Sequence, residues 1–288
     1  GLGDTGIYNI ADTGSYYANP ALYTTATIAL TDKFTLYPGA RLQYYAIQIK
    51  KMGVDPRVRF NWQLRENTAI KGGVGLYTQI PDLINLAPVW GNPRSGLERA
   101  MHTSLGVSHL FDSIGLSLEA TGFYKYVFDR STNSTLLIRD PVTSELRLEN
   151  FANQGYGQIF GMELLVRKAL TKRFFGWVSY TLSKSLIKAR PGEEYHPFAF
   201  DQPHILTILG VYKLPRGWQI GGRFRLVSGN PSTGYFDSVY VQNDYQPWLG
   251  KSERLPAFHQ LDLRVDKTFT YKRVTFNVYL DIINVYNR

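Results

Sequence analysis

Polar and apolar residues alternate strictly in several long stretches of this sequence. In FHQLDLRVDKTF, residues 258–269, aliphatic residues occupy every second position of the central part and charged residues lie between them. Successive side chains of a β-strand point to opposite faces, so the stretch is predicted to be a strand with one apolar and one charged face. Two arrangements accommodate such a strand. In a soluble sandwich the apolar face lies in a core, and in a transmembrane barrel it meets lipid.

The composition limits the classes of protein to consider. The chain has 288 residues, a hydrophobic fraction of 44% and a mean hydropathy of −0.22, and it contains no run of about 18 apolar residues, the length that a membrane-spanning helix needs. It has no cysteine, which excludes disulfides and cysteine-based zinc or redox sites. The formal net charge is +9, but the basic residues are spread along the chain, so we expect no nucleic-acid binding. Residues 1–20 lack the features of a signal peptide, so we expect a mature form or part of a longer gene product.

Short and long connections alternate along the chain. Short polar turns join pairs of strand-like runs at 31–33, 65–67, 112–113, 171–173, 215–217 and 271–273. Longer connections separate these pairs at 78–100, 129–155, 187–202 and 229–257, with a shorter one at 49–55. Alternate connections of an up-and-down antiparallel sheet lie at the same rim, so all short turns are expected at one end and all long loops at the other. Outer-membrane barrels have this asymmetry, whereas a Greek-key sandwich has no reason for it.

The length of the alternating runs points to the same fold. Several runs reach the length of about 9–11 residues that a membrane-spanning strand needs. The sequence therefore predicts an all-β fold, an antiparallel transmembrane β-barrel of about twelve strands over residues 1–288. Aromatic residues gather near the predicted strand ends, as in interfacial girdles, although they are also common strand residues. The charged residues at alternating positions are predicted to face a lumen: Arg57, Arg59, Glu163, Arg167, Arg223, Arg225, Asp262, Arg264 and Asp266.

Opposite charges on neighbouring strands are expected to pair across the barrel wall. Arg223 and Arg225 are the candidate partners for the acidic residues of the stretch 258–269.

Catalytic and metal-binding motifs are missing from the sequence. The five histidines lack the i, i+4 spacing of a helical metal site, although His196 and His204 lie near one long loop and could approach each other. Lone histidines are mostly structural, so we expect no metal site and no cofactor. No Gly-x-Ser-x-Gly elbow occurs, and we expect no enzyme. Gly72, Gly73 and Gly75 resemble a phosphate loop only superficially, because the trailing Gly-Lys-Ser/Thr is missing.

The long loops are the expected place for ligand recognition, because loops carry binding residues on rigid scaffolds. The alternative is that their aromatic residues pack the loops together or lie at the outer membrane interface. The candidate ligand-binding residues are Trp90, Asn92, Arg94, Tyr240, Tyr245 and Trp248.

From about residue 20 onward, the sequence resembles the C-terminal half of the β-barrel of TonB-dependent outer-membrane receptors. The likeness rests on the order of several segments rather than on any one motif. They are LTDKFTLYPGARLQYY (30–45), DPRVRFNWQLRENTAIKGGVGLYTQ (55–79), GNPRSGLERA (91–100), GQIFGMELLVRKALTKRFFGWVSYTLSKS (157–185), FDQPHILTILGVYKLPRGWQIGGRFRLVSGNP (200–231), LPAFHQLDLRVDKTF (255–269) and NVYLDIINVYNR (277–288).

The resemblance implies a location in the bacterial outer membrane and a larger architecture. Members of the family have an N-terminal plug domain, a TonB-box peptide and a barrel of 22 strands. Neither a plug nor a TonB box is recognisable here, so the chain is expected to be a barrel portion. Its expected partners are outer-membrane lipid, a small-molecule ligand, TonB through a plug outside this chain, and another chain that completes the barrel wall.

The function that the resemblance implies is the uptake of a small nutrient of the siderophore, vitamin or glycan class, dependent on TonB if a plug exists elsewhere. Two alternatives remain at this point. A barrel of this kind could serve as a non-transporting scaffold or subunit of a cell-envelope complex. A soluble β-sandwich that binds glycans is the third hypothesis.

Overall fold

The structure is a computed structural model of the whole chain. It describes residues 19–46, 50–87, 91–139, 144–170, 173–232, 240–241, 244–245 and 253–287. Among the described residues, no helix is long and apolar enough to span a membrane.

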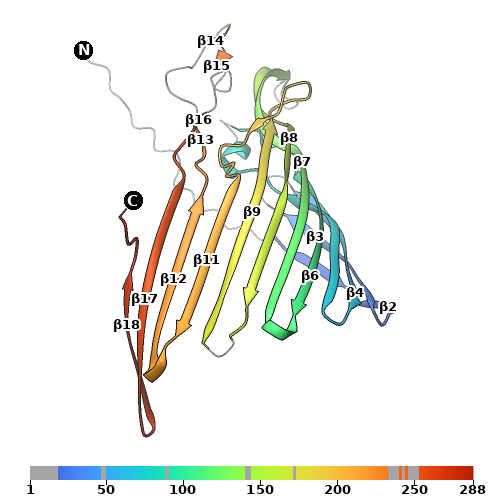
Figure 1. Ribbon diagram of the computed structural model, residues 1–288. Coiled ribbons are helices and arrows are strands. Elements are labelled where there is room, and N and C mark those ends of the chain that lie inside the picture. The colour runs from blue at the N-terminus through green and yellow to red at the C-terminus, as the bar shows by residue number, and fades with distance from the viewer. Residues whose placement is uncertain are drawn as a thin grey trace, which may run out of the picture.

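One large antiparallel sheet dominates the structure (Figure 1). Its strands follow one another in the order β1-β3-β4-β5-β6-β7-β8-β9-β11-β12-β17-β18, so nearly every strand pairs with its neighbours in the sequence. The strands of this path are β1 (Ala21–Thr25), β3 (Phe34–Tyr45), β4 (Lys51–Arg65), β5 (Thr68–Gln79), β6 (Glu98–Phe111), β7 (Leu116–Arg139), β8 (Leu146–Lys168), β9 (Phe174–Lys188), β11 (His204–Lys213), β12 (Trp218–Val227), β17 (Phe258–Tyr271) and β18 (Val274–Ile282).

The remaining elements are short. β2 (Ile28–Thr31) pairs with the first residues of β3, and β1 pairs with the later part of the same strand. β10 (His196–Pro197) pairs with β9. Two further pairs lie in the connection between β12 and β17: β13 (Pro231–Ser232) with β16 (Glu253–Arg254), and β14 (Tyr240–Val241) with β15 (Asp244–Tyr245). The 3-10 helices are η1 (Leu83–Leu86), η2 (Asp112–Ile114) and η3 (Pro215–Gly217). The expectation of about twelve strands is confirmed by the main path of the sheet.

The short connections lie at one end of the sheet and the long ones at the other, as the sequence predicts (Figure 1). One of the short turns joins β11 to β12 through η3. There Gly217 has a φ of +78°, and a Cβ atom at this position would approach the carbonyl oxygen of Thr268 to 2.6 Å. Only glycine tolerates both conditions, so this turn fixes where β11 ends and β12 begins.

The strand register produces two continuous faces of opposite character. Residues directly opposite each other in an antiparallel pair project to the same face. Phe224 pairs with Leu261, and the next position of each strand forms the pair of Arg223 with Asp262. The apolar face continues across the sheet, and its side chains are exposed in the structure. Examples are Met52, Val54, Val58, Trp62, Leu105, Met162, Ile208, Ile220, Val278 and Leu280.

The nine charged residues of the lumen prediction all project from the other, polar face, which the register connects from β4 to β17. In β4 this face is the more covered one, because Asp55 is 6% exposed while Met52 and Val54 on the apolar face are 61% and 48% exposed. That the polar face lines a water-filled lumen stays a prediction.

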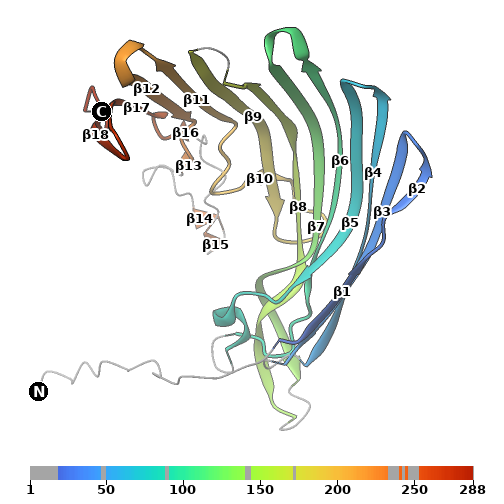
Figure 2. The same ribbon diagram turned by 90° about the horizontal axis from the view of Figure 1, so that it is seen from below.

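The sheet curves into an arc and does not close among the described residues (Figure 2). β1 pairs only with β3, and β18 pairs only with β17. The hairpin of β13 and β16 lies inside the arc. The outer edges of β1 and β18 thus have no partner strand among the described residues.

The prediction of a long loop over residues 129–155 is wrong for most of that range, because β7 and β8 continue through it. They pair as far as Arg139 and Leu146, with register shifts at three places. The run of Ser, Thr and Asn in this region has the composition of a loop, yet the extended hairpin packs against the β5–β6 connection. In this region Ser131, Thr132 and Ser134 are between 6% and 7% exposed.

A charge on the apolar face tests the assignment of the two faces. Leu105 lies near the middle of β6 and is 60% exposed on the apolar face. We expect Leu105→Arg to lower the free energy of unfolding in phospholipid vesicles by about 2–4 kcal/mol, the cost of an arginine at the lipid midplane of a barrel. The measurement is a urea titration of the assembled outer-membrane protein.

The matched control is Thr121→Arg, because Thr121 pairs with Gly106 at nearly the same depth and with Glu163 on the polar face. We expect it to change the free energy of unfolding by less than about 1 kcal/mol, the size of an ordinary exposed ion pair. Equal losses for the two variants would contradict the assignment of the faces.

Candidate functional site

A buried acidic residue ties two long connections together at the end of the sheet that carries the long loops. Asp201, between β10 and β11, is fully buried. Its Oδ1 accepts a hydrogen bond of 2.7 Å from the backbone N–H of Ser185 in β9. Arg254 of β16 forms an ion pair with Oδ2 of Asp201 and donates from Nη1 to the Asp201 carbonyl oxygen at 2.6 Å. Asp201 therefore joins the barrel wall to the connection between β12 and β17.

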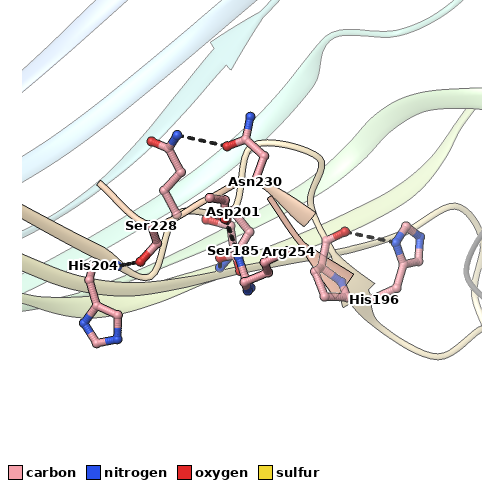
Figure 3. Close-up of polar contacts among 10 residues, drawn as sticks. Ser185, His196, Asp201, His204, Ser228, Asn230 and Arg254 are labelled. Carbon is pink, nitrogen blue, oxygen red and sulfur yellow. Dashed lines mark hydrogen bonds and ion pairs between the residues drawn. The ribbon is translucent and has the colours of Figure 1, made fainter. Parts of the chain in front are cut away.

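Three neighbouring contacts reinforce this junction (Figure 3). Arg254 Nη1 also donates to the Gly229 carbonyl oxygen at 3.2 Å, and Gln202 Nε2 donates to Asn230 Oδ1 at 2.9 Å. The backbone N–H of His204 donates to Ser228 Oγ at 3.1 Å. The start and the end of the β12–β17 connection are thus both fastened to the segment that precedes β11. We call Asp201, Gln202, Ser228, Asn230 and Arg254 the loop junction.

A groove of about 630 Å³ lies beside the loop junction. Its lining combines Asp201, Pro203 and Arg254 with Phe123 and Ser183, which project from the polar face of β7 and β9. The groove has a mostly apolar floor next to a charged pair. Such a mixture suits a small organic molecule that carries a few polar groups.

A second cluster holds the β5–β6 connection against the extended part of β7 and β8. Asn92 is 6% exposed; its Nδ2 donates to the Phe151 carbonyl oxygen at 2.8 Å, and its Oδ1 accepts from the backbone N–H of Arg94 at 3.1 Å. Glu98 Oε1 accepts from the backbone N–H of Ser131 at 2.9 Å. The segment GNPRSGLERA thus fastens this loop to the rim.

Charged side chains form a ladder across β12, β17 and β18 on the polar face. Arg223 donates to Asp262 Oδ2 from Nε at 3.0 Å and from Nη2 at 2.6 Å. The second oxygen, Oδ1, accepts from Gln260 Nε2 at 2.7 Å and from the backbone N–H of Asn284 at 3.0 Å. The predicted pairing of Arg223 with an acidic residue of 258–269 is confirmed. Arg225 has no ion pair with the described residues.

Arg264 continues the ladder toward the free edge. Its Nε donates to Asp266 Oδ1 at 2.9 Å, its Nη1 approaches Asp281 Oδ2 at 3.2 Å, and its guanidinium lies 4.0 Å from the centre of the Tyr279 ring. Sequence reasoning did not assign Asp281 and Tyr279 to this group. Their alternation with apolar residues of β18 was the available signal.

The structure places the six predicted ligand-binding residues of the long loops in different settings. Trp90 and Trp248 lie outside the described residues. Tyr240 and Tyr245 pair through their backbones in β14 and β15. Arg94 is exposed, whereas Asn92 is buried and bonded to backbone. A ligand-binding role for these residues stays a prediction.

Three of the five histidines bond to neighbouring hydroxyl groups. His204 Nδ1 lies 2.7 Å from the Tyr180 hydroxyl, His109 Nδ1 lies 2.8 Å from Thr68 Oγ1, and the His259 ring lies 2.8 Å from the Tyr286 hydroxyl. No group of three or more His, Asp or Glu residues that could hold a metal ion occurs in the part of the chain that the structure describes.

Comparisons with known proteins assign the family. Residues 2–285 match the family model described as TonB dependent receptor-like, beta-barrel. The search of curated proteins gave no match.

Solved outer-membrane receptors share the fold at low sequence identity. The siderophore receptor PirA from Acinetobacter baumannii has a TM-score of 0.72 at 14% identity, covering 91% of this chain and 41% of that one. The ferric-catecholate import receptor Fiu from Escherichia coli K12 has a TM-score of 0.69 at 15% identity, covering 94% and 40%. The FrpB iron transporter from Neisseria meningitidis has a TM-score of 0.64 at 17% identity, covering 94% and 41%. The chain thus spans about two fifths of the length of these structures, and it belongs to the TonB-dependent receptor β-barrel family of the bacterial outer membrane.

Proposed function

We propose that the chain forms part of the barrel of a TonB-dependent receptor that takes up a small nutrient of the siderophore, vitamin or glycan class. The observation that carries the proposal is the charged polar face beneath anchored long loops. Under this proposal the loops capture the ligand, and the charged face guides it inward. A non-enzymatic, receptor-type role agrees with the family.

The open sheet supports a larger assembly. Unpaired backbone groups in hydrocarbon cost several kcal/mol each, so the free edges of β1 and β18 need partner strands within the membrane. We propose that further strands of the same receptor close the barrel and that a plug domain outside residues 1–288 connects the lumen to TonB. The three structural relatives are an iron transporter, a ferric-catecholate import receptor and a siderophore receptor. Ferric chelates are therefore the first ligands to test.

The loop junction has a part in this function. A binding loop loses less conformational freedom on capturing a ligand when it is already held in place. Asp201 and Arg254 hold the β12–β17 connection to the wall, beside the groove. We propose that they preorganise this loop for ligand entry.

Uptake by cells tests the main proposal. We expect deletion of the gene that encodes the chain to abolish uptake of one radio-iron-labelled siderophore, or of one labelled vitamin or glycan, and complementation to restore it. Inactivation of TonB is expected to remove the same uptake. Unchanged uptake of all three classes, with the protein present in the outer membrane, would favour the non-transporting scaffold.

Removal of one member of the buried ion pair tests the junction. We expect Arg254→Gln to cost about 3–5 kcal/mol of local stability, because Asp201 would remain buried without its counter-charge. Hydrogen exchange at the backbone amides of Ser185 and His204 measures this loss. The expected consequence is weaker ligand binding by the intact receptor.

Arg190→Gln is the matched control, because Arg190 forms a surface ion pair with Glu193 in the neighbouring connection. We expect a change of less than about 0.5 kcal/mol, as for exposed pairs three residues apart. If Arg254→Gln leaves exchange at Ser185 as slow as in the Arg190→Gln protein, the junction does not anchor the loop.

A further inference from the structure

Three cations lie side by side on the polar face of β4 and β5, and none of them has an acidic partner. Arg57 and Arg59 are two residues apart in β4. Gly73 of β5 lies opposite Arg59, so Lys71 is the diagonal neighbour of Arg59 on the same face. Within the part of the chain that the structure describes, the three side chains form no ion pair and donate no hydrogen bond. We call Arg57, Arg59 and Lys71 the basic cluster.

The basic cluster differs from the charged ladder across β12, β17 and β18, where two arginines each bond to a carboxylate on the same face. Beside the cluster, Asp55 is 6% exposed and accepts a hydrogen bond of 2.8 Å from Thr78 Oγ1. On the polar face of β7 and β8, Glu119 and Glu163 lie two and three strands from Lys71, roughly 10–14 Å away at the usual strand spacing. Like charges on neighbouring strands destabilise a sheet, so strand pairing does not account for the cluster.

A hollow of about 490 Å³ lies on the polar face at the basic cluster, lined by Arg59 and Lys71. Its other polar lining residues are Tyr37, Asn61, Ser104 and Thr121. Gly106 of β6 lies opposite both Lys71 and Thr121, and a Cβ atom there would collide with Thr121 Oγ1. The hydroxyl group of Thr121 therefore lies over this glycine, on the side of the sheet that carries Lys71.

Arg59 is held in place while its hydrogen-bond donors stay free. Its guanidinium lies 5.5 Å from the centre of the Tyr37 ring, a cation–π contact that leaves the N–H groups available. A guanidinium has five N–H donors in a planar fork, which matches the two oxygens of a carboxylate or a phosphate. Lys71 adds an ammonium group, and Ser104 and Thr121 add hydroxyl donors. This set of donors selects an oxyanion and disfavours a cation.

We propose that the hollow binds the carboxylate or phosphate group of an anionic nutrient inside the lumen, with Arg59 as the bidentate contact and Lys71 as the second charge. Lys71 is the fourth residue of β5, so the hollow lies toward the end of the sheet with the short turns. The groove beside the loop junction lies at the opposite end, and a ligand that enters through the loops meets it first. The inference rests on the proposed function and deepens it, because it makes an anionic group part of what the receptor recognises.

The experiment measures the binding of inorganic phosphate to the intact receptor. The protein is purified in a phosphate-free detergent, and the phosphorus NMR line width of the anion is followed during a titration at constant ionic strength, with chloride as the balancing anion. We expect Arg59→Gln to weaken binding at least about tenfold, because the charge and both hydrogen bonds of the fork are lost. Arg59→Lys is expected to lose less affinity, because it keeps the charge and loses only the fork.

Arg225→Gln is the matched control. Arg225 also projects from the polar face and has no ion pair with the described residues, but it lies on β12, opposite Thr207 and Gln260 and away from the hollow. We expect this variant to bind phosphate as the unmodified receptor does. Equal weakening by Arg225→Gln and Arg59→Gln would show a general effect of positive charge in the lumen and would overturn the assignment to the hollow.

The remaining outcomes also decide the proposal. Unchanged binding by Arg59→Gln overturns it. If the unmodified receptor binds no phosphate and Arg59→Gln lowers its thermal midpoint, an acidic side chain of the receptor itself fills the hollow, which overturns a site for a nutrient. Should Arg59→Gln fail to fold, Lys71→Gln and Arg59→Lys decide the same question. Nutrient uptake is measured separately in cells, so a receptor that binds phosphate here and transports none of the tested nutrients contradicts the uptake proposal alone.

Discussion

Hydrogen bonding of the backbone between neighbouring strands is the constraint on which the rest of this structure depends. Within hydrocarbon an N–H or C=O group has no water to bond, so every strand must satisfy both of its edges with other strands. The path from β1 to β18 does this for ten strands, since each has a partner on both sides. The end strands have a partner on one side only among the described residues. The sheet is thus one continuous hydrogen-bonded surface with an open edge at each end of the described path.

The same constraint explains why this protein has almost no buried apolar core. Among the described residues, the buried hydrophobic side chains are Tyr45, Ala69, Leu86 and Val227. In a soluble protein of this length, burial of apolar side chains would supply most of the stability. Here the apolar side chains lie on an exposed face, and lipid takes the place of a core. The polar face carries charge pairs such as Arg223 with Asp262, whose partners lie on adjacent strands.

Features that depend on local alternation were predictable from the sequence, and features that depend on the path of the loops were not. Alternation predicts which face Arg223 and Asp262 share, and the register follows because a shift by one residue would move every side chain to the wrong face. The pair of Asp201 with Arg254 joins residues 53 positions apart, and no local pattern marks it. The extension of β7 and β8 also escaped prediction, because its Ser, Thr and Asn residues have the composition of a loop and are ordered by packing against the β5–β6 connection.

The two-faced register also explains how the fold tolerates divergence. A position on the apolar face needs only a lipid-compatible side chain, and a position on the polar face needs only one that water accepts. Neither requirement specifies the shape of the side chain, because these positions do not lie in a tightly packed core that would restrict side-chain volume. Many sequences therefore satisfy the same backbone, in agreement with TM-scores of 0.64–0.72 at 14–17% identity. Under the proposed function, selection for ligand choice would alter the loops and the polar face while the apolar face keeps only its general character.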